Sequence, residues 1–453
     1  MSAVFVVHLS IWSTGKADAP FPFDIGGRGL FAAIQPVYDG KVSNLRFVFG
    51  GLMMRMVGLG MNRTVLMAWV SVCIALLPLP ALAIESCVSR LKQEAVSAGV
   101  NPSVASRMLD GARYDEKVIR FSTSQPEYQI PIWDYMAFLV DPKRIEDGRQ
   151  LMRQHARTLS AVEQRYGVDK HVVLAVWGIE SDFGQVRGDF YTPHALANLV
   201  CAGGRRSNYF RGELIKTLQI ASRGDVPVEA FQGSWAGAFG QTQFMPTTYA
   251  ALAVDFDGDG RKDLVNSIPD ALGSTANFLK DAGWRNTRPW GMEVKVPDGY
   301  SGPEGRRDYA SLDTWNRRGL AKIDGSRLSG ALEAGLIRPA GANGPAFLVT
   351  RNFHAIRTYN ASTSYALAIV LLSELVAGRG PFVTPWPTDN PGLSRAQRFE
   401  LQKLLNQNGF NVGEPDGKVG PMTRAGIRAA EEKFGMPVTG RPSWNVYYAL
   451  GGR

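Results

Sequence analysis

The sequence predicts a mainly α-helical protein of the α+β class, followed by a small helical unit at its C-terminus. Apolar residues recur at helical spacing through most of the chain between residues 86 and 378. Segments with strand character are few, and the clearest are Met292–Val296 and Ala346–Val349. With 45% hydrophobic and 20% charged residues, a chain of 453 residues is long enough for two or three globular domains.

The helical segments share apolar residues three and four positions apart, which place one apolar face against a core. They are Glu85–Ala98, Val104–Leu109, Glu146–Tyr166, Lys170–Ile179, Phe210–Ser222, Pro269–Ala282 and Ala366–Val376. A run with four prolines follows and is typical of a semi-rigid linker. The sequence therefore predicts a main domain over residues 84–378, a linker over 379–392 and a terminal domain over 393–453.

The segment at residues 61–83 has the layout of a secretory signal peptide. Arg63 precedes an apolar run that is short for a membrane span, and Ala81-Leu82-Ala83 offers a small-residue cleavage site. Such a signal should begin a protein, so we expect translation to start at a later methionine and residues 1–60 to be a non-native extension. A genuine extra N-terminal segment is the alternative. An exported protein would be periplasmic.

The charge and cysteine content narrow the class of partner. Without residues 1–83 the net charge changes from +9 to +6, so the surface suits an acidic polymer. Nucleic acid is disfavoured, because the export signal and the lack of basic clusters argue against it. Cys87 and Cys201 remain in the exported chain, and the sequence leaves open whether they form a disulfide.

Glu180 ends a nearly continuous apolar run, His171–Ile179, and is followed by Ser-Asp-Phe-Gly. A carboxyl group buried there is either a structural charge with a partner or an acid kept protonated for catalysis, because desolvation raises the pKa of Glu. Considered alone, the segment favours the structural interpretation. Its context in the rest of the chain favours the catalytic one.

Three further motifs supply that context. The segment 233–246 combines glycines, aromatic residues and amides, as a sugar-binding cleft requires. Asp255, Asp257 and Asp259 with a glycine at the sixth position match a calcium-binding loop, although the twelfth position is Asn266. The segment Tyr359–Tyr365 combines helix-capping residues with two tyrosines. Flexible-loop composition and ordinary capping are the alternatives for the first and third motifs.

The motifs VWGIESDFG, GSWAGAFGQTQFMPTTY, DFDGDGRKDL and RTYNASTSYALA occur here in the order seen in lytic murein transglycosylases of the B family. The resemblance covers roughly residues 86–379. It implies a lysozyme-like catalytic domain with an inserted EF-hand-like loop. It also implies cleavage of the β-1,4 bond between N-acetylmuramic acid and N-acetylglucosamine in peptidoglycan, with no organic cofactor.

The resemblance assigns roles to individual residues. It implies that Glu180 is the catalytic acid. The positions that match glycan contacts are Ser234, Gln243, Phe244, Met245, Tyr359, Asn360 and Tyr365. The positions that match calcium ligands are Asp255, Asp257, Asp259, the Arg261 carbonyl and Asp270, of which Asp270 is the least certain because its link to Asp263 is about one residue longer than in the family. The run GEPDGKVGPMT at residues 413–423 resembles a three-helix peptidoglycan-binding module.

The sequence around Glu180 lacks the second carboxylate of ordinary glycoside hydrolases. Asp182 lies two residues away, and a two-residue offset on a helix points elsewhere. We therefore expect Glu180 to act first as acid and then as base, so that the muramic acid 6-hydroxyl attacks and leaves a 1,6-anhydro end. The alternatives are a hydrolytic muramidase and an inactive wall-binding protein. Peptidoglycan strands are the expected partner, and other cell-wall enzymes are further candidates.

Overall fold

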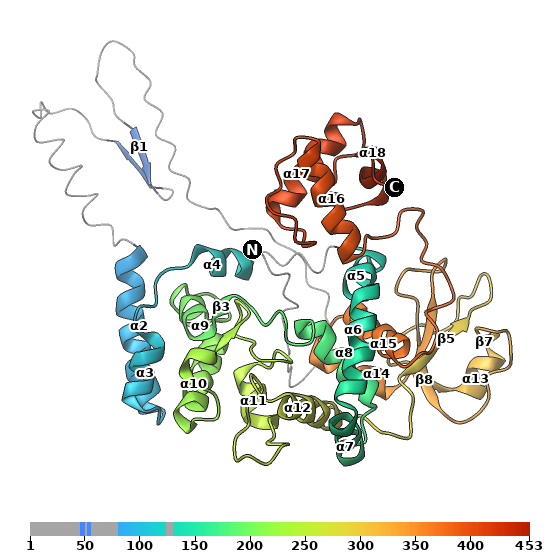
Figure 1. Ribbon diagram of the computed structural model, residues 1–453, viewed down its shortest axis with the longest axis horizontal. Helices are drawn as coiled ribbons and strands as arrows, with labels where there is room; N and C mark the ends of the chain where they lie inside the picture. The colour runs from blue at the N-terminus through green and yellow to red at the C-terminus, as the bar shows by residue number, and fades with distance from the viewer. Residues whose placement is uncertain (1–45, 50–51, 56–79, 124–129) are drawn as a thin grey trace, which may run out of the picture. The chain divides into compact units, whose positions relative to one another are not determined.

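The computed structural model describes residues 46–49, 52–55, 80–123 and 130–453 (Figure 1). Strands β1 (Arg46–Phe49) and β2 (Leu52–Arg55) form an antiparallel hairpin in a separate unit that spans Trp12–Ala83. Most of the segment predicted to be a signal peptide, residues 61–79, lies outside the described residues. Helix α2 (Pro80–Ser97) begins at its end and continues through the predicted cleavage residues. Among the described helices, none has the length and hydropathy needed to span a membrane.

The predicted helices are present, with one change. Helix α2 and helix α3 (Pro102–Leu109) begin earlier than predicted, because each has a proline in its first turn. The predicted helix Glu146–Tyr166 is wrong as a single element, since it divides at His155 into two helices. The His155 ring packs edge-on against Trp177, with ring centroids 5.8 Å apart. The spacing of apolar residues does not predict this tertiary contact. The two helices are α6 (Pro142–Gln154) and α7 (Ala156–Tyr166).

The main domain is built around α8 (Lys170–Ser181), in which every residue from Val172 to Ser181 is buried. The Asp169 side chain caps its first turn by accepting the His171 N–H at 2.7 Å. Neighbouring helices cover α8 on all sides, so its sequence is apolar nearly throughout rather than on one face. The packed neighbours are α6, α7, α12 (Ile268–Asp281) and α15 (Thr363–Val376).

Further helices and short strands complete the domain (Figure 1). The helices are α4 (Glu116–Thr123), α5 (Ile132–Leu139), α9 (Thr192–Cys201), α10 (Ser207–Arg223), α11 (Pro246–Leu252) and α14 (Arg351–Tyr359). The strands β3 (Phe190–Tyr191) and β4 (Gln232–Gly233) pair antiparallel, and a 3-10 turn, η2, covers Val228–Ala230.

The largest sheet is antiparallel and five-stranded, with the order β6-β8-β9-β5-β7. It has its own apolar cluster, centred on the fully buried Trp315 of α13 (Leu312–Arg317). Both predicted strands are confirmed, one of them shifted by a residue. The partner strands went unpredicted because two of them are only two residues long. The strands are β5 (Gly291–Lys295), β6 (Ala310–Ser311), β7 (Ala321–Lys322), β8 (Glu333–Ile337) and β9 (Ala346–Val349).

A disulfide joins Cys87 on α2 to Cys201 at the end of α9, with a sulfur–sulfur distance of 2.02 Å. The sequence had left this pairing open. The bond closes a loop over a separation of 114 residues, so it ties the N-terminal helix to the body of the domain.

The C-terminal domain has three helices and a separate core that includes Leu401, Leu405 and Ile427. The run that follows the first helix is held by the Gln402 side chain, which accepts the Gly417 N–H at 2.7 Å and donates to the Lys418 carbonyl at 2.9 Å. The three-helix prediction is therefore confirmed. The helices are α16 (Arg395–Gln407), α17 (Pro421–Lys433) and α18 (Trp444–Ala449).

Candidate active site

Glu180 lies in the last turn of α8 and is 5% exposed. The hydroxyl of Tyr365, a fully buried residue in the first turn of α15, donates a hydrogen bond to its Oε1 atom. Burial raises the pKa of Glu180 well above its ordinary value, and the Tyr365 hydrogen bond lowers it by less. Glu180 is therefore protonated at a pH where an exposed Glu would be ionised, which is the state a general acid needs.

Tyr359 is the second tyrosine near this carboxyl group. Its hydroxyl donates to the Thr242 carbonyl at 2.6 Å, which joins the end of α14 to the glycine-rich segment 233–246. Burial raises the pKa of Tyr359, and Glu180 in its ionised form raises it further, as both do for Tyr365. Both tyrosines are therefore neutral hydrogen-bond donors.

Asp182 faces away from Glu180 into a cluster of ion pairs. It accepts hydrogen bonds from Arg144 Nε at 3.0 Å and from Arg395 Nη1 at 2.7 Å. Burial opposes ionisation of Asp182, but the Arg395 hydrogen bond and the Arg144 charge outweigh burial and lower its pKa. Asp182 is thus an ionised structural residue, as its two-residue offset predicted. The arginines went unpredicted, because both come from distant helices and no local pattern marks them.

Two hydrogen bonds lock the end of α8 to the segment 233–246. The Trp177 indole N–H donates to Gln241 Oε1 at 2.9 Å, and the Ser181 hydroxyl donates to the Gln241 carbonyl. Gln241 and Ser181 were not among the predicted site residues. Both stand inside the motifs that carry the family resemblance, so the motifs themselves were the signal for them.

Gln243 has both hydrogen atoms of its side-chain amide in use. Its Nε2 atom donates to the carbonyls of Arg187 and Gly240, each at 2.9 Å. Its Oε1 atom is buried and accepts no hydrogen bond from the described residues. A buried acceptor without a donor costs about 1–3 kcal/mol. The Gln243 amide oxygen is therefore fixed in direction and has no donor among the described residues.

Like Gln243, which is 1% exposed, the other predicted contact residues are buried. Ser234 is fully buried, and its hydroxyl accepts the Ala238 N–H at 3.0 Å inside the glycine-rich turn. Phe244 and Met245 are 0% and 1% exposed, and Phe244 packs against Tyr359. Their side chains shape the site from behind.

Asn360 is 7% exposed and precedes the predicted capping residue of α15. Its Oδ1 atom accepts the Ser362 N–H at 3.2 Å, and the Ser362 hydroxyl in turn accepts the Tyr365 N–H at 3.3 Å. Asn360 therefore helps to start the helix that carries Tyr365. The cap of α15 is Ser362, in agreement with the capping alternative offered for the serine and threonine of this segment.

Three non-glycine residues in the described part of the chain have positive φ angles, and all three lie near Glu180. They are Asp182 at 53°, Phe183 at 57° and Gln243 at 52°. Such conformations are uncommon for residues with side chains and gather at functional sites. Glycine is required nearby for a different reason, because a Cβ atom on Gly188 would lie 2.0 Å from the Gly233 carbonyl oxygen.

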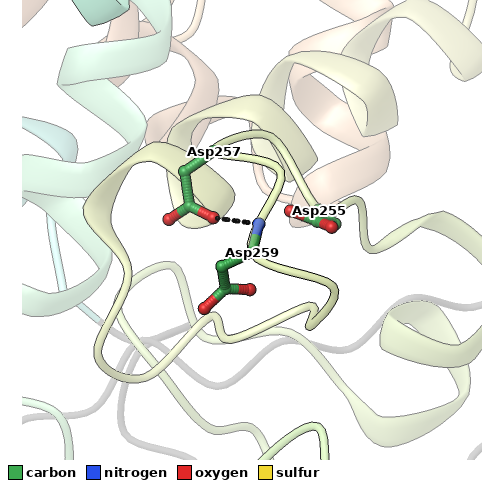
Figure 2. A group of neighbouring side chains, drawn as sticks. All are labelled: Asp255, Asp257 and Asp259. Atoms are coloured by element: carbon green, nitrogen blue, oxygen red, sulfur yellow. Dashed lines mark hydrogen bonds between the residues drawn. The ribbon is translucent and has the colours of Figure 1, made fainter.

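The acidic loop lies between α11 and α12. The carboxylate oxygens of Asp255, Asp257 and Asp259 lie within 4.8 Å of one another, and Figure 2 shows them around one turn of chain. Gly258 and Gly260 supply the positive φ angles, 82° and 89°, that this tight loop needs. Clustered oxygen donors suit a hard cation such as Ca²⁺.

Asp270 has a different position from the other three acids. It is fully buried, and it accepts the Phe256 N–H at 2.7 Å and the Asp263 N–H at 2.8 Å. In this structure Asp270 holds the two ends of the loop together, and it is not in the carboxylate group of Figure 2. Arg261 contributes its backbone N–H to Asp259 Oδ1 at 2.8 Å.

A helical domain that buries a protonated glutamic acid beside two tyrosines defines an enzyme of the general acid–base type. Comparison with known proteins identifies the family. The Transglycosylase SLT domain matches residues 83–374, and the Putative peptidoglycan binding domain matches residues 394–450. The chain belongs to the SLT transglycosylase family and has a C-terminal peptidoglycan-binding domain.

Similar proteins include several lytic transglycosylases. The Membrane-bound lytic murein transglycosylase B of Escherichia coli K12 is 34% identical over 248 residues, which cover 54% of this chain and 66% of that protein. SltB3 from Pseudomonas aeruginosa, solved in complex with NAG-anhNAM-pentapeptide, is 41% identical with a TM-score of 0.65. The match covers 81% of this chain and 99% of SltB3. The E. coli lytic transglycosylase SLT35 in complex with calcium is 29% identical with a TM-score of 0.57, over 64% of this chain and 92% of SLT35.

Proposed function

We propose that this protein is a peptidoglycan lytic transglycosylase that cleaves the β-1,4 bond between N-acetylmuramic acid and N-acetylglucosamine and leaves 1,6-anhydromuramic acid ends. The observation that carries the proposal is the Glu180 carboxyl group, which is buried, raised in pKa and hydrogen-bonded to Tyr365 within an SLT domain. The lytic transglycosylases among its relatives and the anhydro product bound to SltB3 support it.

The reaction needs one proton donor that becomes a proton acceptor. Protonated Glu180 gives its proton to the glycosidic oxygen as the bond from that oxygen to the anomeric carbon breaks. The resulting carboxylate takes the proton of the muramic acid 6-hydroxyl, whose oxygen then bonds to the anomeric carbon. Glu180 is protonated again at the end, and no water is consumed.

A single carboxylate is enough for this sequence of steps. Hydrolysing glycosidases use two carboxyl groups, one of them as nucleophile or base. The carboxylate next in sequence, Asp182, is held by Arg144 and Arg395 and does not face the reacting bond. This arrangement favours the intramolecular 6-hydroxyl over a carboxylate-activated water.

Gln243 and Tyr359 belong to the wall of the site on this proposal. The available Gln243 Oε1 suits the N–H of a substrate N-acetyl group, whose carbonyl oxygen would then point at the anomeric carbon and stabilise its positive charge. Tyr359 fixes the backbone one residue before Gln243 through the Thr242 carbonyl. Ser234, Phe244, Met245 and Asn360 act through the shape of the site.

A calcium ion is the proposed ligand of the acidic loop, since Asp255, Asp257 and Asp259 form a donor set that fits it. The ion would hold the loop between α11 and α12 and supplies no step of the reaction. The Arg261 carbonyl and Asp270 are the remaining proposed ligands. Asp270 would reach the ion with an oxygen that also accepts a backbone N–H.

The protein acts at the cell wall or in the periplasm, where its substrate lies. We infer export by the segment at residues 61–83 and a working chain that begins near residue 84, with the domain limits 84–378, 379–392 and 393–453. The C-terminal domain would keep the enzyme on peptidoglycan. Complexes with other cell-wall enzymes are a further proposal.

The test is Glu180→Gln, which keeps the size of the side chain and removes its proton chemistry. We expect normal binding to isolated peptidoglycan with nearly all release of soluble fragments lost. The exposed Glu146→Gln is the matched control and should keep wild-type activity. Mass spectrometry of the wild-type products decides the reaction, because an anhydro end lacks one water relative to a hydrolysed end. Reducing muramic acid ends would make the protein a muramidase, and full activity of Glu180→Gln would remove Glu180 from the mechanism.

A further inference from the structure

A second site with unusual chemistry lies in the same domain, between the end of α12 and the start of α14. It is a cavity of about 700 Å³. Its polar lining is basic or aromatic, and none of its lining residues is acidic. We call it the arginine cavity, and it is lined by Ala282, Gly283, Arg285, Arg288, Arg307, Tyr309, Arg351 and His354.

Three separate segments bring these arginines together. Arg288 stands in the loop before β5, Arg307 in the turn before β6, and Arg351 at the first position of α14. The turn with Arg307 is fixed to the sheet, because the Gly305 N–H donates to the Leu336 carbonyl of β8 at 2.9 Å. The position of the Arg307 backbone is thus set by the fold.

Aromatic and histidine side chains hold the rest of the lining. The Arg351 guanidinium lies 5.0 Å from the centroid of the Tyr309 ring, which is a cation–π distance. His354 Nε2 contacts the Arg306 carbonyl at 2.8 Å, so α14 is tied to the same turn. Burial lowers the pKa of His354, and the nearby arginines lower it further. The histidine is therefore neutral, and the charge of the cavity comes from arginine.

The positive charges here have no acidic partner. Within the described residues, no carboxylate oxygen lies within 4.0 Å of Arg285, Arg288, Arg307 or Arg351 in an ion pair. Behind them, on α14, Arg357 has a buried Nε atom without a hydrogen-bond partner. Like charges gathered at fixed positions repel one another, and an anion between them removes that cost.

We propose that the arginine cavity binds an oxyanion, namely a carboxylate of the peptide stem carried by the bound glycan strand. This inference rests on the proposed function. Guanidinium groups bind carboxylates through paired hydrogen bonds, and four of them around one cavity suit the several carboxylates of such a peptide.

The position of the cavity relative to the active site supports this assignment. Arg351 begins α14 and Tyr359 ends it, eight residues later. At 1.5 Å per residue, the helix places them about 12 Å apart. A stem peptide is attached to muramic acid, so its carboxylates lie away from the glycosidic bond that Glu180 attacks. Helix α14 therefore connects the reacting end of the substrate to its charged branch.

The first experiment measures binding of a free stem tetrapeptide by calorimetry. The triple variant R288Q/R307Q/R351Q should bind it at least about tenfold more weakly than wild type, since each lost charge-assisted pair is worth about a factor of ten or more. The matched control R113Q/R205Q/R327Q removes three exposed arginines elsewhere and should bind as wild type does. Should the triple variant fail to fold, the single variant Arg307→Gln replaces it.

The second experiment separates this proposal from the reaction itself. Turnover is measured on glycan strands with intact stems and on strands from which an amidase has removed the stems. The cavity variant should show a raised KM on the first substrate and wild-type kinetics on the second. Equal losses of activity on both substrates, or the same loss in the control triple variant, would overturn the proposal. Either result would mean that the arginines only attract an acidic polymer through their charge.

Two further outcomes are informative. Inorganic phosphate presents anionic oxygens to the arginines as a carboxylate does. If the cavity binds phosphate but not the tetrapeptide, it is an oxyanion site that does not take the peptide stem, and the assignment is overturned. Wild-type enzyme that leaves no anhydro ends on glycan with or without stems would refute the proposed function. Calorimetry with the tetrapeptide would still report on the cavity in that case, so the two failures are distinguishable.

Discussion

Tyr365→Phe tests how the protein controls its catalytic acid. The substitution removes only the hydroxyl that donates to Glu180 Oε1. A hydrogen bond to a charged group contributes about 1.5–3 kcal/mol. The Tyr365 hydrogen bond becomes stronger as Glu180 gives up its proton, so its loss raises the barrier of that step. With about 1.36 kcal/mol for each factor of ten, kcat should fall by about 10- to 150-fold.

The pH dependence gives a second readout of the same change. The Tyr365 hydrogen bond lowers the pKa of Glu180, and burial raises it. Without the hydroxyl, the pKa of Glu180 rises further, so the protonated acid persists to higher pH and the alkaline limit of activity moves upward. The assay is release of anhydromuropeptides from isolated peptidoglycan over a pH series. Tyr191→Phe is the control. It removes a tyrosine hydroxyl that donates to the Val228 carbonyl and not to Glu180. Wild-type kcat with an unchanged pH profile in Tyr365→Phe would refute the reasoning.

Three other predictions concern stability. The folded-state pKa of Glu180 is raised above its ordinary 4.5, so its stabilising contribution is complete below that pH and is lost as pH rises through the folded pKa. Glu180→Gln should therefore match wild type at pH 4 and be more stable at pH 7.5 by chemical denaturation. Replacing Cys87 and Cys201 by Ser should lower the free energy of unfolding by about 2–5 kcal/mol, measured the same way against wild type under non-reducing conditions. Ca²⁺ at a hundredfold excess over its Kd should add about 2.7 kcal/mol to wild type and raise its Tm, and should leave the double variant Asp255→Asn, Asp257→Asn unchanged.

The helices of the main domain could be predicted from apolar spacing because each one packs against a shared core. Helix α8 was predicted to within two residues at its end, since its apolar run is bounded by Asp169 and Asp182. The division of α6 from α7 could not be predicted. The break lies at His155, whose ring packs against Trp177 of α8, and the apolar spacing shows neither the break nor this contact.

Features of the site that depend on local sequence could also be predicted, whereas those that depend on tertiary contacts could not. The carboxylates Asp255, Asp257 and Asp259 could be predicted to converge, because their spacing within one loop dictates it. The ion pair between Asp182 and Arg395 could not, since it joins residues separated by more than two hundred positions. The hydrogen bond between Tyr365 and Glu180 was not predicted either, although both residues belong to recognised motifs, because the resemblance assigned Tyr365 to glycan contact.

Three residues near Glu180 have strained backbone conformations, and their surroundings offset this strain to different extents. Residues held in left-handed conformations cost about 1–3 kcal/mol each, and Asp182, Phe183 and Gln243 are all of this kind. Asp182 offsets its own cost through two arginine hydrogen bonds, and Phe183 does so by packing its ring edge-on against Trp177. Gln243 has no such compensation at its Oε1 atom. The fold thus stabilises two of the three strained residues and leaves the buried Gln243 Oε1 atom without a donor among the described residues, as the proposed contact with a substrate N-acetyl group requires.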